Sequence, residues 1–207
     1  MGRSVELNIP IIGILLGIEA DFFGPLMAAA FEAGLQAIEV TYNTAHALEM
    51  VKEQIPRVPQ GKYLGMGTIR NLEEARQAVD AGAMYLVSPN TDIAVIEYAK
   101  RRQIPIVAGA FTPTEVYAAW SAGAEMVKVF PCGAMGPGYI RELLGPYDRM
   151  PLVAVGGVTA DNAASYLQAG ARAVGVGTSL FGKEAIARRR PQEITDNVKK
   201  FISRSIS

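Results

Sequence analysis

The sequence predicts an α/β fold, a single (β/α)8 barrel of the TIM type over residues 1–207. The chain has 207 residues, 50% of them hydrophobic, and α/β barrels of this length commonly form one domain. Apolar runs typical of strands alternate with amphipathic stretches typical of helices. An approximate repeat of one helix and one strand extends along most of the chain. An open, doubly wound sheet is the alternative architecture.

The repeat is marked by four segments that end in Ala-Gly and precede a short apolar run. Each glycine comes where a helix is expected to end in a left-handed residue, a conformation that glycine adopts without strain. The apolar runs that follow are AIEVT, MYLVS, MVKVF and AVGVG. This period is typical of stacked βα units and differs from that of an all-helical array. The four glycines are Gly34, Gly82, Gly123 and Gly170.

We expect eight strands, each a continuous apolar run, because a parallel strand that is covered on both faces carries few polar residues. Amphipathic stretches with helical spacing lie between them. Asn71, Asp92 and Asp161 precede such stretches as candidate N-caps, and Pro113 and Pro137 suit first turns. The expected strands are Ile11–Leu16, Ala37–Thr41, Tyr63–Met66, Met84–Ser88, Ile104–Gly109, Met126–Phe130, Leu152–Val155 and Ala173–Val176.

Composition argues against several classes of function. Twenty basic and twenty acidic residues cancel, so charge offers no basis for binding nucleic acid or a membrane surface. The apolar stretch 9–18 is too short to span a bilayer and has no cleavage site, so we reject a signal peptide. A single cysteine and a single histidine argue against a disulfide framework and a zinc site. We therefore expect a cytoplasmic protein without metal or other cofactor.

Two ionisable residues interrupt the expected strands. Glu39 lies within Ala37–Thr41, and Lys128 lies within Met126–Phe130. In a barrel of this type the active site lies at the C-terminal ends of the strands, so polar residues there are informative. A buried structural ion pair is the alternative, but such a pair is costly to bury and often adds little stability. Function therefore explains the two charges better.

A lysine in these surroundings is suited to imine chemistry. Its apolar neighbours remove hydration, which disfavours the ammonium and lowers the pKa of the amine. A neutral amine attacks a ketone, and the resulting iminium withdraws electrons from the adjacent carbon–carbon bond. A nearby carboxylate, for which Glu39 is the candidate, moves the protons that these steps require. The predicted reaction is the cleavage or formation of a carbon–carbon bond by Lys128.

Glycine-rich stretches follow the last two expected strands. They are Val155–Thr159 and Gly175–Ser179, and helical sequence comes after both. In these barrels the loops after strands 7 and 8 form a common phosphate site from backbone N–H groups and a helix N-terminus. Ordinary tight turns are the alternative. Neither stretch has the G-x-G-x-x-G or Walker A pattern, so a nucleotide is not indicated.

Other candidates carry less information. Thr68 and the turn Ser88–Asn90 lie at expected strand ends, where they suit a small oxygen-rich ligand, and turn chemistry explains them equally well. Cys132 comes shortly after Lys128, but nothing marks it as a nucleophile. His46 begins an expected helix, and we expect it on the helix surface.

In chain order these motifs resemble the 2-keto-3-deoxy-6-phosphogluconate (KDPG) aldolase family. The resemblance covers nearly the whole chain, and Lys-x-Phe-Pro is its most specific part. It implies a class I aldolase, an aldehyde-lyase without metal and typically a homotrimer. The family reaction cleaves a phosphorylated 2-keto-3-deoxy sugar acid to pyruvate and glyceraldehyde 3-phosphate. The matching segments are Glu39–Thr41, Gly65–Thr68, Val87–Pro89, Lys128–Pro131, Gly156–Val158 and Gly175–Gly177.

The resemblance also implies roles for individual residues. Lys128 corresponds to the Schiff-base lysine, and Glu39 corresponds to the acid/base. Around the pyruvyl portion of the substrate it implies Thr68, Pro89 and Phe130. At the phosphate it implies a set of residues from the two glycine-rich stretches, namely Gly156, Gly157, Gly177 and Thr178.

The sequence departs from the family at two substrate-binding positions. Members commonly carry an arginine near the end of the first strand or just after Glu-Val-Thr, where this chain has Leu16 and Asn43. Without either guanidinium, bidentate anchoring of a carboxylate is lost. Asn43 and Ala154–Gly157 are closer to the branch that acts on 2-keto-3-deoxy-6-phosphogalactonate.

Several alternatives for the function therefore remain. The substrate is the phosphogluconate type, 2-keto-3-deoxy-6-phosphogalactonate or 4-hydroxy-2-oxoglutarate. A phosphosugar isomerase or epimerase, or a thiamine-phosphate-type synthase, would share the phosphate loops on a similar barrel. A non-catalytic barrel that binds a phosphorylated metabolite is the third class.

Overall fold

The eight strands form one closed barrel in the computed structural model, which describes residues 5–147 and 149–206. The strands follow sequence order around the barrel, every pairing is parallel, and β1 pairs with both β2 and β8. The (β/α)8 barrel is thus confirmed, and the doubly wound sheet is excluded. The strands are β1 (Ile11–Leu15), β2 (Ala37–Thr41), β3 (Tyr63–Gly67), β4 (Leu86–Val87), β5 (Ile106–Ala110), β6 (Met126–Val129), β7 (Leu152–Val155) and β8 (Ala173–Val176).

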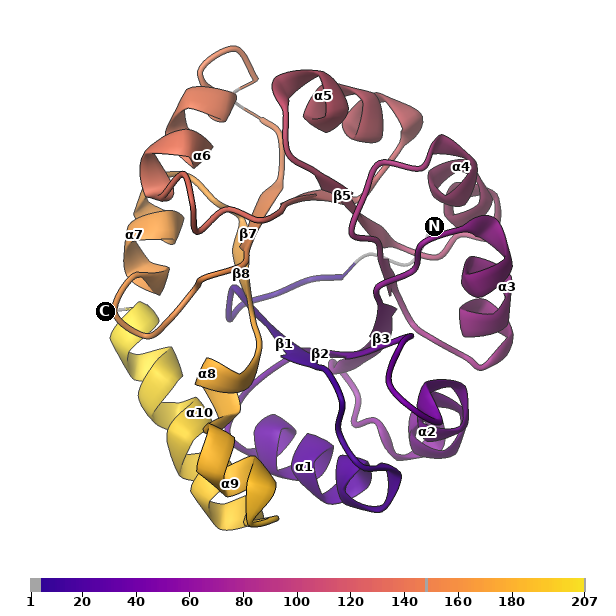
Figure 1. Ribbon diagram of the computed structural model, residues 1–207, viewed down its shortest axis with the longest axis vertical. Coiled ribbons are helices and arrows are strands. Elements are labelled where there is room, and N and C mark those ends of the chain that lie inside the picture. Colours follow the sequence, from indigo (N-terminus) through magenta and orange to yellow (C-terminus); the bar gives the residue numbers. More distant parts are fainter. Residues whose placement is uncertain (1–4, 148, 207) are drawn as a thin grey trace.

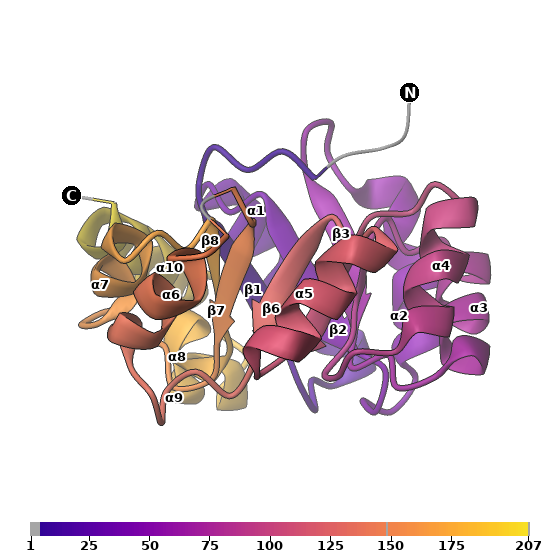
Figure 2. The same cartoon turned by 90° about the horizontal axis from the view of Figure 1, so that it is seen from above.

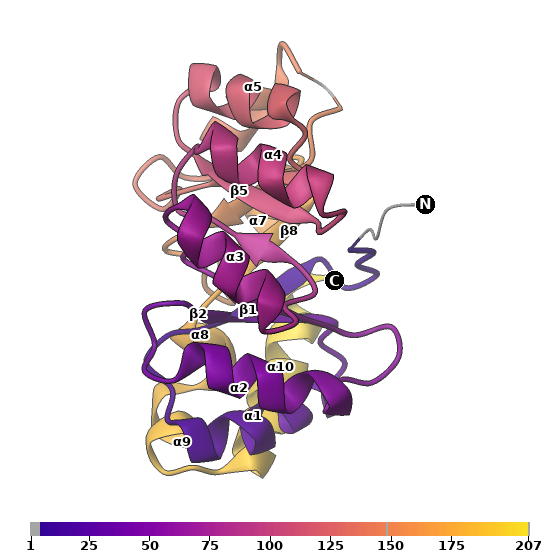
Figure 3. The same cartoon turned by 90° about the vertical axis from the view of Figure 1, so that its right-hand side faces the viewer.

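Helices surround the barrel (Figure 1). After β8 the chain forms two short helices before the long α10, which packs beside α1 (Figure 3). No helix of the described residues is long and apolar enough to cross a membrane. The helices are α1 (Ala20–Glu32), α2 (Ala47–Gln54), the 3-10 turn η1 (Ile55–Arg57), α3 (Leu72–Asp80), α4 (Ile93–Arg101), α5 (Pro113–Ala122), α6 (Pro137–Leu144), α7 (Ala163–Gln168), α8 (Thr178–Phe181), α9 (Lys183–Ala187) and α10 (Pro191–Ser205).

The helix ends agree with most of the expected signals. Asn71 accepts a hydrogen bond from the backbone N–H of Glu74 at 3.0 Å, and Asp92 accepts one from Ala94 at 2.9 Å. Both are therefore N-caps, as predicted. The glycines of the four Ala-Gly segments all have left-handed φ angles, and they are Gly34, Gly82, Gly123 and Gly170.

The predicted cap at Asp161 is wrong by one residue. Asn162 is the N-cap residue of α7, and its Oδ1 accepts a hydrogen bond from the N–H of Thr159 at 2.8 Å. This bond closes the turn before the helix and leaves Asp161 exposed. Asp161 instead pairs with Arg204 of α10 at 3.2 Å.

Two apolar cores hold the barrel together. The larger one lies between the strands and the helices, and the smaller one fills the barrel interior. Val5 and Leu7 belong to the interior core, because the segment before β1 crosses the N-terminal end of the barrel (Figure 2). The loops that follow the strands therefore surround the opposite end, where a (β/α)8 barrel carries its site.

Candidate active site

Lys128 and Glu39 both point into the barrel. Lys128 lies on β6 with 6% of its surface exposed, and Glu39 lies on β2 with 1% exposed. Both line one internal cavity of about 10 Å³, the space of about one water molecule. The other lining residues are apolar side chains and a glycine, namely Ile12, Ile14, Val87, Val107, Val153, Val155 and Gly175. The two predicted ionisable residues thus come together in an apolar chamber.

The chamber shifts both groups toward their neutral forms. Burial raises the pKa of Glu39 to about 7, and the positive charge of Lys128 opposes this rise. Burial lowers the pKa of Lys128, and the charge of Glu39 opposes this decrease. The described residues contain no direct ion pair between the two side chains. The structural ion pair that the sequence left open is therefore not formed.

One glycine on the strand beside β2 and one on the strand beside β6 leave the space that Glu39 and the turn near Lys128 occupy. A Cβ on Gly67 of β3 would lie 2.7 Å from the carboxyl carbon of Glu39. Gly109 of β5 is the register partner of Lys128, and a Cβ there would lie 2.5 Å from the backbone nitrogen of Asn90. The turn that contains Pro89 therefore packs directly against the strand beside Lys128.

Ser88 holds that turn in place. Its hydroxyl accepts a hydrogen bond from the N–H of Gly109 at 3.1 Å and donates one to the carbonyl of Asn90 at 2.8 Å. Ser88 is 1% exposed, so both bonds are shielded from water. Thr68, at the end of β3, is half-buried and has a φ of 57°, which is rare for a residue other than glycine. Pro89 and Thr68 thus lie at the strand ends, as predicted.

Phe130 lies at the mouth of the chamber. The Nζ of Lys128 is 4.9 Å from the centre of the Phe130 ring, a distance suited to a cation–π contact, and Phe130 is 38% exposed. Cys132 beyond it is buried, and burial raises the pKa of its thiol, which disfavours a nucleophilic thiolate. His46 is an exposed residue at the start of α2, as predicted.

The glycine-rich loops after β7 and β8 line a second cavity of about 370 Å³. Gly156 and Gly157 adopt left-handed φ angles of 94° and 74°, which require glycine. Gly177 and Ser179 line the same cavity, and the Ser179 hydroxyl donates to the Val158 carbonyl at 3.0 Å. This bond, which the sequence did not predict, ties the two loops together.

The second cavity adjoins the Lys128–Glu39 chamber. Ile14, Val155 and Gly175 line both spaces. Thr178 is exposed and begins α8, but it is not among the residues that line the cavity. A ligand bound at the glycine loops would therefore extend toward Lys128.

The positions where family members carry arginine lie in two linked loops. Leu16 follows β1 and is 67% exposed, and Asn43 follows β2 and is also exposed. The N–H of Gly17 donates to the Thr44 hydroxyl at 2.9 Å, so the loops are joined next to both residues. The buried Thr44 hydroxyl also lies 2.9 Å from that of Thr41. The T-x-x-T spacing of Thr41 and Thr44, which starts at the end of β2, is a sequence signal for the hydrogen bonds that join these loops.

Comparison with known proteins identifies the family. Residues 5–197 match the aldolase family described as "KDPG and KHG aldolase". The chain belongs to this family. As an aldolase it is an enzyme of the carbon–carbon lyase class.

Relatives of this aldolase include proteins from both substrate branches. It is 34% identical over 174 residues to the probable 2-dehydro-3-deoxy-6-phosphogalactonate aldolase of Rhizobium meliloti, which covers 83% of this chain and 82% of the relative. It is 30% identical over 198 residues to the 2-dehydro-3-deoxy-6-phosphogalactonate aldolase of Escherichia coli, with 95% and 96% covered. It is 32% identical over 147 residues to the 2-dehydro-3-deoxy-phosphogluconate aldolase of Treponema pallidum, with 69% and 68% covered.

Solved structures of similar proteins share the whole barrel. A structure named "Native KDPGal structure" superposes on this aldolase with a TM-score of 0.88 at 28% identity, covering 99% of this chain and all of the other. The KDPG aldolase of Legionella pneumophila superposes with a TM-score of 0.85 at 25% identity, covering 92% of each chain. The latter holds pyruvate as a covalent carbinolamine intermediate.

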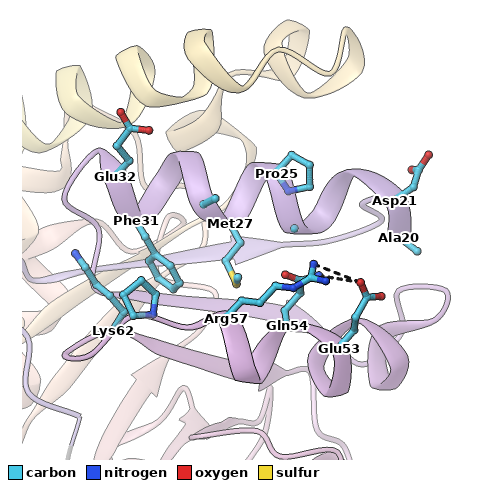
Figure 4. A pocket seen from close by; sticks show the side chains of 13 residues that line it. Ala20, Asp21, Pro25, Met27, Phe31, Glu32, Glu53, Gln54, Arg57 and Lys62 are labelled. Carbon is cyan, nitrogen blue, oxygen red and sulfur yellow. Dashed lines mark hydrogen bonds and ion pairs between the residues drawn. The ribbon is translucent and has the colours of Figure 1, made fainter.

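A groove of about 1030 Å³ lies outside the barrel of this aldolase. Figure 4 shows that Met27 and Phe31 of α1 face Gln54 of α2 and Arg57 of η1, with Lys62 beside Phe31. None of the predicted site residues lines this groove. The volume of this groove therefore does not identify it as the predicted site.

Proposed function

We propose that this chain is a class I aldolase that cleaves a 2-keto-3-deoxy-6-phospho sugar acid of the phosphogluconate type to pyruvate and glyceraldehyde 3-phosphate. The observation that carries the proposal is the apolar chamber that Lys128 and Glu39 share, next to the glycine-lined cavity. In this chamber the pKa of the Lys128 amine is lowered, which favours its neutral form, and Glu39 has a carboxyl group that exchanges its proton near neutral pH. The mechanism requires no metal.

The reaction begins when the neutral Nζ of Lys128 attacks the C2 ketone of the substrate. The carbinolamine loses water to give an iminium, with Glu39 as the proton donor. The Glu39 carboxylate then takes the proton of the C4 hydroxyl. The C3–C4 bond breaks, its electron pair enters the enamine on Lys128, and the aldehyde leaves. Glu39 returns its proton to C3, and water releases pyruvate from the resulting imine.

The remaining predicted residues bind the substrate in this proposal. Thr68, Pro89 and Phe130 surround the pyruvyl portion, because all three lie at strand ends next to the chamber. The loops of Gly156, Gly157, Gly177 and Thr178 hold the phosphate through backbone N–H groups, with Ser179 beside them. Asn43, in the loop after β2, completes the proposed substrate-binding set, and Leu16, after β1, stands where family members commonly carry an arginine.

A second candidate substrate is 2-keto-3-deoxy-6-phosphogalactonate. The relatives from Rhizobium meliloti and Escherichia coli carry that name, and Asn43 is the residue typical of this branch. The two substrates differ in configuration at one sugar carbon, so the same lysine chemistry serves both. Measuring kcat/KM for both sugar acids with one enzyme preparation decides between them.

Lysine replacement tests the proposal. We expect Lys128→Met to reduce retro-aldol turnover to background, because methionine fills similar space but cannot form an imine. Lys62→Met is the matched control, since Lys62 is a half-buried lysine outside the barrel. If Lys128→Met kept activity toward a phosphorylated substrate, an isomerase, epimerase or synthase would replace the aldolase. Sugar phosphate binding without turnover in the wild type would favour a non-catalytic barrel.

The proposal includes a homotrimer in the cytoplasm. Two aromatic residues of α5 are exposed, namely Trp120 and Tyr117, and the ring centre of Tyr117 lies 5.6 Å from that of the half-buried Tyr147. Exposed aromatic clusters commonly mark interfaces between proteins. We therefore expect light scattering to give the mass of a trimer, and Trp120→Lys to shift it toward the monomer. A monomeric wild type would contradict this assignment.

A further inference from the structure

The barrel interior contains a polar group that the chemistry of Lys128 and Glu39 does not use. Tyr85 precedes β4, is fully buried and belongs to the apolar cluster that fills the barrel. Among the residues described, its Oη is the buried side-chain nitrogen or oxygen that has no hydrogen-bond partner. Leaving such a group unpaired costs free energy, and phenylalanine would fill the same space without that cost. The hydroxyl therefore calls for an explanation other than packing.

Strand β3 brings Tyr85 and Glu39 onto one wall of the barrel. A Cβ on Gly65 would lie 2.5 Å from the Cζ of Tyr85, and one on Gly67 would lie 2.7 Å from the Cδ of Glu39. Gly65 is also the register partner of Glu39. Alternate residues of a strand face the same side, so the phenol ring and the carboxyl group occupy successive places along β3.

The two groups complement each other chemically. Glu39 is 1% exposed and, in the described part of the chain, makes no hydrogen bond or ion pair. Burial raises the pKa of Tyr85 well above its ordinary range, and the charge of Glu39 adds to the rise. The phenol thus keeps its proton at neutral pH and acts toward a carboxylate only as a donor. A buried donor without an acceptor lies beside a buried acceptor without a donor.

We propose that Tyr85 is a positioning residue for Glu39, and that its hydroxyl donates a hydrogen bond to the ionised carboxylate during turnover. The bond forms after a rotamer change of Glu39 or through one bridging water. This inference rests on the proposed aldolase function. The other titratable group that faces Glu39 is Lys128 from β6, while the neighbouring strands present Ile14 and Gly65 at its register.

A hydrogen bond from Tyr85 would oppose the effect of burial on the pKa of Glu39. A hydrogen bond to the charged form of a carboxyl group lowers its pKa, whereas burial raises it. Tyr85 therefore favours the carboxylate at the step where Glu39 takes the proton of the C4 hydroxyl. It also holds the carboxylate in one direction, which leaves fewer unproductive orientations.

Tyr85→Phe tests the inference, because it removes the hydroxyl and keeps the ring beside Gly65. We expect kcat for retro-aldol cleavage to fall about ten-fold or more, the usual effect of losing one hydrogen bond to a charged group. We expect KM to change by less than about two-fold, because the hydroxyl acts through Glu39 and does not contact the substrate. The acid limb of kcat against pH should move to higher pH by about half a unit or more.

Tyr63→Phe is the matched control, since Tyr63 lies on β3 and packs against the same interior cluster as Tyr85. We expect it to leave kcat and the acid limb unchanged. A Tyr85→Phe enzyme with the wild-type kcat, or with a lower kcat and an unmoved acid limb, would overturn the positioning role. A wild type without turnover would instead overturn the aldolase proposal, so the two failures are distinguishable. The melting temperature of Tyr85→Phe should equal or exceed that of the wild type.

Discussion

The buried Glu39 should make the stability of the barrel depend on pH. Burial raises the pKa of Glu39 from an ordinary 4.5 to about 7 in the fold. Each pH unit of difference between the folded and unfolded pKa corresponds to about 1.4 kcal/mol, so ionising Glu39 in the folded state costs roughly 3 kcal/mol. Because the folded pKa is the higher one, the folded state binds the proton more tightly. Stability is therefore lost as the pH rises from about 4.5 to about 7.

Replacing Glu39 by glutamine removes this loss. At pH 4 the two proteins should have nearly equal free energies of unfolding, because the wild-type carboxyl group is then mostly protonated in both the folded and the unfolded state. At pH 8 Glu39→Gln should be the more stable protein by up to roughly 3 kcal/mol. The same variant should lose kcat by about 100-fold or more, since its acid/base is gone.

Urea denaturation at fixed protein concentration, from pH 4 to pH 8, measures the effect. Glu49→Gln is the matched control, because Glu49 lies exposed on α2. Its difference from the wild type should stay within about 0.5 kcal/mol at every pH. A difference between Glu39→Gln and the wild type that did not grow with pH would refute the reasoning.

Three further predictions concern particular contacts. Gly67→Ala should displace the Glu39 carboxylate and lower stability by about 1–3 kcal/mol together with kcat, whereas Gly138→Ala, where a Cβ meets open space, should do neither. A Gly67→Ala variant that kept both activity and stability would show that the Glu39 carboxyl group does not depend on the space beside Gly67. Leu16→Arg should raise kcat/KM for a phosphorylated sugar acid about ten-fold, because a guanidinium binds carboxylate or phosphate oxygens; unchanged kinetics would remove Leu16 from the site. Asn71→Ala should lower the free energy of unfolding by about 1 kcal/mol through the lost cap, and Asn71→Asp should not.

Much of the fold follows from local signals in the sequence. Glycines after Ala mark the ends of helices because a left-handed residue is needed there, and the structure has that conformation at Gly34, Gly82, Gly123 and Gly170. The expected strands match the observed ones to within two residues at each end. β4 is only Leu86–Val87, although the N–H groups of Met84 and Ser88 still bond to the neighbouring strands.

The site could be predicted only where a residue broke a pattern. Lys128 and Glu39 stand out because each places a charge in an apolar strand. Tyr85 did not stand out, because tyrosine is common in strands, and its unpaired hydroxyl exists only in the folded barrel. The fit of Glu39 against Gly67 likewise depends on the register of two strands, which a sequence does not contain.

Imine formation at Lys128 is the central claim, and reductive trapping with pyruvate tests it most directly. The protein is incubated with pyruvate and borohydride, and the adduct is located by peptide mass spectrometry. The account predicts one reduced pyruvyl adduct, carried by Lys128 and absent from Lys128→Met. A folded wild-type protein that forms no adduct, or forms it at another lysine, would contradict the account.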